Sequence, residues 1–376
     1  MRRRVFIPFF LVVALFARPA SIHAMGTPPP HKHIPLRVLV VKAAEKIDLR
    51  IKGPYRIVDF ETEGLLEEDT GLRGRVVSES DIASEGIKIL SENKTRIYIN
   101  NRLFRGNIDI IKNKDAKLMV VNHIDLEEYL YGVLYHEVSH RWPMEVLKAQ
   151  AIAARTYALY QKLVSKNRYY DLFADIYSQV YGGRQSETLS TRRAVNSTLG
   201  MVLAYDDMVF PAYYHATCGG RTSDASTIWD INTPCLRGVE CGFCKMSPHY
   251  QWKKEMTVDE IREKLRDAGY KIDIISIEVL DRDTAERALN VLVKGKSGTV
   301  ELKGNKFRLL LGPNNLKSAN FEIEKKGKYV KFYGKGWGHG IGMCQWGAFG
   351  MARHGWKAEE ILGHYYQGAE IVRVEE

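Results

Sequence analysis

The sequence has few long hydrophobic runs and no evident internal repeat. Its one apolar run near the start, Val5–Phe16, is shorter than the about 20 residues that a transmembrane helix needs. No concentrated basic stretch is present, which argues against a nucleic-acid partner. The glycine-rich segment Gly334–Gly342 has neither the Walker spacing nor an intact GxGxxG pattern. Phosphate-loop and dinucleotide-binding proteins are therefore not indicated.

The composition indicates a folded and mildly basic protein. Hydrophobic residues make up 45% of the 376 residues, which is enough for one large domain or two ordinary ones. The formal net charge is +10, but residues 1–24 contribute four arginines and no acid, so the rest of the chain carries about +6. A moderate positive charge suits association with acidic polymers.

The N-terminus has the pattern of an export signal. Three arginines at positions 2–4 precede the apolar run, and residues 22–24 could precede a cleavage point. We expect residues 1–24 to be a signal peptide or an N-terminal anchor, and residues 25–35 to be a proline-rich linker. The expected location is outside the cytoplasm, in the periplasm or cell envelope, with or without a membrane anchor.

The rest of the chain mixes strands and helices without βαβ regularity. Residues 36–122 alternate apolar and polar side chains between turn signals such as Asn100-Asn101, which predicts a β-rich N-terminal part. Residues 123–376 combine helical and strand patterns. The predicted fold class is α+β, with mainly antiparallel β elements, a central helix segment and additional helices.

The clearest helix is entered through Trp142-Pro143, because proline fits the first helical position. Apolar residues follow at helical spacing, namely Val146, Leu147, Ala151, Ala154 and Ala158. Their small size suits close contacts in a core. Further helices are predicted from about Ser186 to Thr198, capped by Ser186, and from Thr257, which forms a capping box with Glu260.

Glu137 precedes the central helix and is the main candidate for acid–base chemistry. Its neighbours Val133, Val138 and Trp142 are apolar, and burial among such groups raises the pKa of a carboxyl group. A glutamic acid that stays protonated near neutral pH can serve as a general acid. The alternative is a loop glutamate that caps the helix or pairs with nearby basic residues, namely His136, His140 and Arg141.

Several stretches resemble the SpoIID/LytB family (stage II sporulation protein D-like). The longest is EYL-x-GV-x₃-E-x₄-WP-x-E-x-LKAQA-x-AARTYA at 128–158. The others are YSQVYGG at 177–183, YHATCGG at 214–220, LGPNNLKSANF at 311–321 and GKGWGHGIGMCQWGA at 334–348. The resemblance covers nearly all of the chain beyond the linker. It implies a catalytic core at 123–376 and puts the family's catalytic glutamate on Glu137.

The family resemblance implies a lytic transglycosylase, a lyase that cleaves peptidoglycan glycan strands between N-acetylmuramic acid and N-acetylglucosamine. One glutamate would be enough, because the muramic 6-hydroxyl attacks its own anomeric carbon and no second carboxylate has to activate water. No cofactor is expected for catalysis. The alternative is a non-catalytic wall-binding protein that enhances an N-acetylmuramoyl-L-alanine amidase, which would then be its partner.

The matching motifs also supply candidate substrate-binding residues, which are Arg155, Tyr157, Gln179, His215, Lys317, Trp337, His339 and Gln345. Trp337 could stack on sugar faces, and His339 and Gln345 could form hydrogen bonds with them. Arg155 is expected to contact substrate or structure at one remove, because an adjacent arginine would lower the pKa of Glu137. Each polar residue could instead be a satisfied buried group.

The five cysteines allow either a metal site or disulfides. Four of them, Cys218, Cys235, Cys241 and Cys244, lie within 27 residues and include a C-x-x-C pair, a set that zinc favours. Exported cysteines often form disulfides instead, and sequence does not choose between the pairings. A zinc site here would be structural, because four thiolates leave no open position for water. Cys344 is expected to be a small buried residue.

Overall fold

The computed structural model describes residues 33–92 and 95–374. The predicted signal or anchor at 1–24 and most of the linker at 25–35 lie outside the described residues, so both stay predictions. Within the described ranges the fold is α+β with mostly antiparallel sheets, which confirms the predicted class. No helix in this part of the chain is long and apolar enough to cross a membrane.

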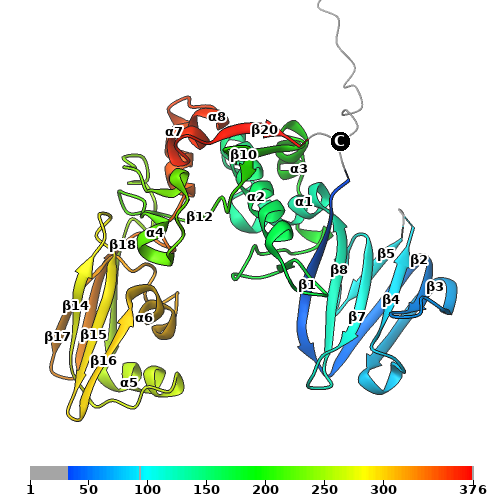
Figure 1. Ribbon diagram of the computed structural model, residues 1–376, viewed down its shortest axis with the longest axis horizontal. Coiled ribbons are helices and arrows are strands. Elements are labelled where there is room, and N and C mark those ends of the chain that lie inside the picture. The colour runs from blue at the N-terminus through cyan, green and yellow to red at the C-terminus, as the bar shows by residue number, and fades with distance from the viewer. Residues whose placement is uncertain (1–32, 93–94, 375–376) are drawn as a thin grey trace, which may run out of the picture. The chain divides into compact units, whose positions relative to one another are not determined.

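The N-terminal strands form one nine-stranded sheet, drawn in blue and cyan in Figure 1. Its strands are β1 Pro35–Ala44, β2 Lys46–Asp59, β3 Leu65–Ser78, β4 Gly86–Ser91, β5 Arg96–Ile99, β6 Arg102–Phe104, β7 Asn107–Lys112, β8 Leu118–Asp125 and β9 Leu172–Phe173. They lie in the order β6-β5-β2-β4-β7-β8-β1-β9, with β3 on β2, and only β9 pairs in parallel. Alternate residues of β2, such as Ile47, Leu49 and Ile51, are buried, so one face of the sheet packs on a core.

The turn predicted at Asn100-Asn101 lies within this sheet. Asn100 and Asn101 have φ values of 48° and 64° and join β5 to β6, which confirms the predicted turn. The predicted boundary between 36–122 and 123–376 stays a prediction, and strand β8 runs across it.

Helix α2, Met144–Val164, lies beside α1, Leu126–Glu137, and α3, Leu189–Ser197 (Figure 1). One face of α2 packs into the core of the large sheet through Leu147, Ala151, Ala154 and Ala158. Another face packs into a second core through Val146, Ala149, Ile152 and Ala153. All eight side chains are fully buried, which explains the small residues, because they let neighbouring elements approach α2 from two sides.

The predicted helix starts need two corrections. Pro143 is the N-cap of α2, with ψ of 144°, and so lies just outside the helix rather than at its first position. Ser186 ends a short 3₁₀ turn, Arg184–Ser186, and α3 is capped by Thr188, whose hydroxyl accepts from the Thr191 amide at 3.2 Å. The predicted capping box of Thr257 and Glu260 is confirmed at the start of α5.

The remaining described elements build three small three-stranded sheets, one two-stranded sheet and five further helices. They are β10 Met201–Tyr205, β11 Met208–Val209, β12 Tyr214–His215, α4 Ala225–Trp229, β13 Gln251–Thr257, α5 Val258–Asp267, β14 Ile274–Arg282, β15 Ala288–Gly295, β16 Gly298–Lys303, α6 Gly304–Leu311, β17 Phe321–Lys326, β18 Tyr329–Lys335, β19 Met343–Cys344, α7 Gln345–Arg353, α8 Ala358–Tyr365 and β20 Glu370–Arg373. Further 3₁₀ turns lie at Glu79–Asp81 and Pro234–Leu236. The small sheets have the orders β11-β10-β20, β13-β18-β17 and β14-β15-β16.

A short parallel pairing brings two of the motif segments together. Strand β12 pairs with β19 so that Tyr214 lies opposite Met343 and His215 lies opposite Cys344. The YHATCGG and GKGWGHGIGMCQWGA stretches, more than a hundred residues apart in sequence, therefore form one local structure.

Candidate active site

Glu137 is the last residue of helix α1, and two hydrogen-bond donors reach its carboxyl group. The Val180 amide donates to Oε1 at 3.2 Å, and the Tyr214 hydroxyl donates to the same carboxyl group. The neighbouring histidines contact other groups, because His136 Nε2 lies 2.7 Å from Ser186 Oγ and His140 stacks on Tyr135. The contacts of Glu137 are therefore not those of a loop glutamate paired with its basic neighbours.

The surroundings of Glu137 favour its protonated form. Burial raises the pKa of Glu137 to about 7, while the hydrogen bonds from Val180 and Tyr214 lower it. None of these three effects on the pKa comes from a charged side chain. A carboxyl group with such a pKa can donate a proton and take one up at neutral pH, which is the requirement for a general acid that later acts as a base.

The direction of the Tyr214 hydrogen bond is fixed by Gln179. The Gln179 amide nitrogen donates to the Ala154 carbonyl oxygen at 3.1 Å and to the Tyr214 hydroxyl at 2.9 Å, and its amide oxygen accepts from the Tyr129 hydroxyl at 3.2 Å. The Tyr214 oxygen therefore accepts from Gln179, and its own proton is free to point at Glu137. Gln179, predicted as a substrate contact, is 1% exposed and acts through Tyr214 instead.

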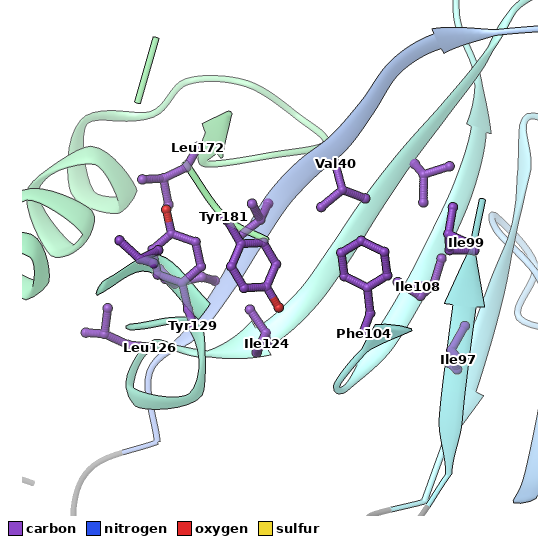
Figure 2. Close-up of a cluster of buried hydrophobic side chains, with 14 of the residues drawn as sticks. Val40, Ile97, Ile99, Phe104, Ile108, Ile124, Leu126, Tyr129, Leu172 and Tyr181 are labelled. Carbon is purple, nitrogen blue, oxygen red and sulfur yellow. The ribbon is translucent and has the colours of Figure 1, made fainter. Parts of the chain in front are cut away.

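The segment that supplies Gln179 and Val180 is held against α1 by Tyr181. Its ring lies between those of Tyr129 and Phe104, at centroid distances of 5.0 and 6.1 Å (Figure 2). The Tyr181 hydroxyl donates to Asn122 Oδ1 at 3.1 Å. At Gly182 an added Cβ would lie 2.2 Å from His136 Nε2, so only glycine lets the segment pass this close to α1.

Arg155 makes a structural contact, which is one of the two alternatives expected for it. It is 0% exposed, and its Nε and Nη2 donate to the two carboxylate oxygens of Glu127 at 2.8 and 2.7 Å. It also donates to the Met201 carbonyl oxygen at 2.9 Å. Since Glu127 belongs to α1 and Arg155 to α2, the pair ties together the two helices nearest Glu137.

A pocket with a volume of about 270 Å³ lies beside Tyr214. It is lined by Tyr157, Ile176, Tyr177, Ser178, Tyr213, Tyr214, Trp229, Asn305, Arg308, Leu309 and His339. Aromatic rings dominate one part of this lining, and Arg308 contributes a cation. Sequence reasoning named Tyr157 and His339 but missed Tyr214, the immediate neighbour of His215. Neighbouring strand residues face opposite sides, and the sequence did not say which of the two faces the pocket.

The two predicted histidines have fixed and different roles. His339 lines the pocket, accepts from the Ile341 amide at Nδ1 (3.1 Å) and donates from Nε2 to the Tyr214 carbonyl oxygen (3.0 Å). Burial, followed by the guanidinium groups of Arg287 and Arg308, lowers the pKa of His339 to about 3, so it is neutral. His215 is 4% exposed and bonds through Nδ1 to the Ile341 carbonyl oxygen at 3.1 Å.

The remaining predicted substrate residues lie outside the pocket lining. Lys317 Nζ lies 5.2 Å from the ring centroid of Trp337 and 3.1 Å from His249 Nδ1. Gln345 is buried and donates to Gln150 Oε1 at 3.2 Å, which links α7 to α2. A hydrogen bond from Gln345 to a sugar is therefore not supported, and this prediction is corrected to a helix–helix contact.

The structure also corrects the predicted cysteine set. The sulfur atoms of Cys218, Cys241, Cys244 and Cys344 all lie within 4.8 Å of one another, and all four residues are buried. Cys235 is not in this group, because it lies in the 3₁₀ turn Pro234–Leu236 and packs into the second core. Cys344 takes its place because the pairing of β12 with β19 brings it to Cys218. No disulfide joins any of the five cysteines, all of which lie in the described residues.

Known proteins resemble this chain over most of its length. A family model described as stage II sporulation protein matches residues 114–205, and a domain of unknown function, DUF8618, matches residues 240–342. An uncharacterised protein of Brachyspira hyodysenteriae is 33% identical, covering 90% of this chain and 92% of that protein.

Two relatives from Bacillus subtilis carry functional names. Stage II sporulation protein D is 32% identical over 67% of this chain and 75% of its own length. An amidase enhancer is 27% identical over 64% of this chain, which spans 40% of that protein. The identity, the extent of the matches and the motifs around Glu137 agree, and the chain belongs to the SpoIID/LytB family.

Proposed function

We propose that this protein is a lytic transglycosylase that cleaves peptidoglycan glycan strands, with Glu137 as both acid and base. Membership of the family supports a role related to the cell wall. The observation that carries the finer proposal is the Glu137 carboxyl group, held by the Val180 amide and the Tyr214 hydroxyl with a pKa of about 7.

The proposed reaction needs one carboxyl group. Protonated Glu137 gives its proton to the glycosidic oxygen between N-acetylmuramic acid and N-acetylglucosamine, and that bond breaks. The muramic 6-hydroxyl attacks its own anomeric carbon, and the Glu137 carboxylate takes up the hydroxyl proton. The products are a new N-acetylglucosamine end and a 1,6-anhydro-muramic end, and Glu137 returns to its protonated form.

The pocket beside Tyr214 has the chemistry of a site for an acidic sugar. Tyr157, Tyr213 and Trp229 offer faces on which a pyranose ring can lie, and Arg308 offers a cation for the lactyl carboxylate of muramic acid. Asn305 supplies an amide for hydroxyl groups. To reach glycan strands the chain has to be exported, and the N-terminal segment is the proposed signal or anchor.

The experiment is digestion of purified glycan strands followed by mass analysis of the ends. We expect 1,6-anhydro-muramic ends from the wild type and at least about 10²-fold slower release from Glu137→Gln, the usual loss for a positioned acid. Glu128→Gln on the same helix is the control. Because Gln cannot ionise, Glu137→Gln should also be at least as stable as the wild type above pH 7 in thermal unfolding.

The amidase enhancer among the relatives gives the alternative function a specific basis. In that case the protein would bind the wall and increase cleavage by an N-acetylmuramoyl-L-alanine amidase without forming anhydro ends. Strands incubated with the amidase, with and without this protein, distinguish the two. The enhancer function would be supported, and the transglycosylase proposal overturned, by faster amide cleavage with unchanged glycan length. Glu137→Gln should then give the same result as the wild type.

A further inference from the structure

We propose that Cys218, Cys241, Cys244 and Cys344 bind one divalent transition-metal ion, with zinc as the expected occupant, in a structural site separate from Glu137. The proposal does not rest on the glycan-cleaving reaction. It differs from the set suggested by sequence spacing, because Cys344 replaces Cys235.

The geometry of the four sulfurs fits a tetrathiolate site. In a tetrahedral zinc site with Zn–S bonds of about 2.3 Å, the sulfurs lie about 3.8 Å apart. Here all four lie within 4.8 Å of one another, and Cys218 Sγ is 3.5 Å from Cys244 Sγ. Small side-chain rotations would close them around an ion. The convergence of four buried sulfur atoms from three separate segments on one point is the arrangement that a shared metal ion requires.

Backbone amides already point at two of these sulfurs. Cys344 Sγ accepts from the Cys218 amide at 3.2 Å and from the Gly347 amide at 3.3 Å. Cys218 Sγ accepts from the Gly220 amide at 3.4 Å. Such N–H groups stabilise anionic sulfur and orient it, as the outer contacts of metal ligands do.

Glycine makes room for a third sulfur. An added Cβ at Gly347 would lie 2.6 Å from Cys241 Sγ, so a side chain at this position of α7 would push Cys241 away from the cluster. The Cys241 sulfur also lies 3.1 Å from the Tyr365 hydroxyl of α8.

A buried cation beside the cluster supports a negative charge there. Four thiolates and one divalent ion carry a net charge of −2. Arg287 is 0% exposed, and its Nη2 donates to the Cys218 carbonyl oxygen at 2.9 Å. Within the described residues Arg287 forms no salt bridge, and its Nε has no hydrogen-bond partner. The nearby Asp283 carboxylate already acts on it, and a buried guanidinium is stabilised further by an additional anion beside it. A metal–thiolate centre would supply that anion.

The site would fasten three segments that few regular hydrogen bonds hold together. Cys218 follows β12, Cys241 and Cys244 lie in a turn that follows the isolated bridge between Arg221 and Glu240, and Cys344 is the N-cap of α7. Losing the ion should loosen the region around β12, which carries Tyr214, so stability should fall first and activity afterwards.

Metal analysis of the full chain tests the proposal directly. We expect one zinc ion per chain, and five reactive thiols after denaturation with a chelator. Another divalent transition metal at one per chain would support the site and change only its occupant. A metal-free protein would overturn the proposal, whether its four clustered cysteines were oxidised to disulfides or were free thiols.

Matched variants distinguish the structural set from the sequence set. Cys344→Ser should weaken zinc retention by at least about tenfold, and Cys235→Ser should retain zinc and keep the wild-type Tm. The opposite result would overturn the assignment. If Cys344→Ser fails to fold, the wild type produced with Co²⁺ provides the test, since tetrahedral thiolate ligation gives intense charge-transfer absorption. Absence of that absorption in a cobalt-loaded chain would also overturn the site.

Discussion

At the scale of single residues, burial and two neutral hydrogen-bond donors set the pKa of Glu137. Burial raises its pKa from the usual 4.5 to about 7, and the Val180 and Tyr214 donors limit that rise. Because the folded-state pKa lies above the unfolded one, ionisation of Glu137 opposes folding increasingly as the pH rises from 4.5 to above 7. The site therefore keeps an acid at the expense of stability, which is common at catalytic positions.

The Tyr214 hydroxyl can be tested through the pH dependence. Tyr214→Phe removes a donor that stabilises the carboxylate, so the pKa of Glu137 should rise. The limb of kcat/KM that falls as Glu137 loses its proton, near pH 7 in the wild type, should then move to higher pH. Tyr131→Phe is the control. Tyr131 lies on α1, the helix that carries Glu137, but its hydroxyl donates to Asn196. An unmoved limb in Tyr214→Phe would contradict the proposed contact.

At the scale of elements, the position of Glu137 depends on how α1 packs on α2. The buried pair of Glu127 and Arg155 joins these helices, and Glu127 Oε1 also accepts from the Gly200 amide at 3.1 Å. Gln345 and Gln150 make a similar link between α7 and α2. The conspicuous polar residues of these motifs therefore act largely by holding helices together.

Arg155→Met tests this structural role. It leaves the Glu127 carboxylate buried without its cation, so the free energy of unfolding should fall by about 3–5 kcal/mol. Adding Glu127→Gln should recover most of the loss, because no buried charge remains. Lys294→Met, which removes the exposed pair with Glu278, should change stability by about 0.5 kcal/mol. Denaturant unfolding measures all three. A stable Arg155→Met protein with a raised KM would instead indicate a substrate contact.

At the scale of the whole molecule, the pocket is assembled from segments far apart in sequence. Tyr157 comes from α2, Trp229 from the end of α4, Arg308 from α6 and His339 from the loop before β19. Arg308 and His339 lie in the stretch matched by the domain of unknown function. The pocket therefore combines residues from outside the matched sporulation-protein segment with the region around Glu137.

Trp229→Ala tests whether this pocket binds glycan. Losing one aromatic face should weaken binding by roughly tenfold, equivalent to about 1.4 kcal/mol. Binding to intact strands is best measured in the Glu137→Gln background, where the ligand is not cut. Trp337→Ala is the matched comparison, because Trp337 does not line the pocket. A larger loss with Trp337→Ala would place the sugar at the glycine-rich stretch instead.

The sequence by itself determined the family, the fold class and the central helix, and it singled out Glu137 as the candidate acid. These features rest on local signals. Helical spacing requires only that Leu147, Ala151 and Ala154 lie on one face, and a dense motif can be read along the chain. The C-x-x-C pair could also be predicted from the sequence, because both sulfurs come from one turn.

Only the tertiary structure decided which polar residues surround Glu137 and which are buried elsewhere. Gln345 was expected to bind sugar and Arg155 to contact either substrate or structure, and packing places both between helices. Tyr214 was missed because the pairing of β12 with β19 sets which side of the strand faces the pocket. The same pairing brings Cys344, rather than Cys235, to the other three sulfurs. The physical reason is common to these cases. Burial, hydrogen-bond direction and the meeting of distant segments depend on long-range packing, which residue spacing alone does not encode.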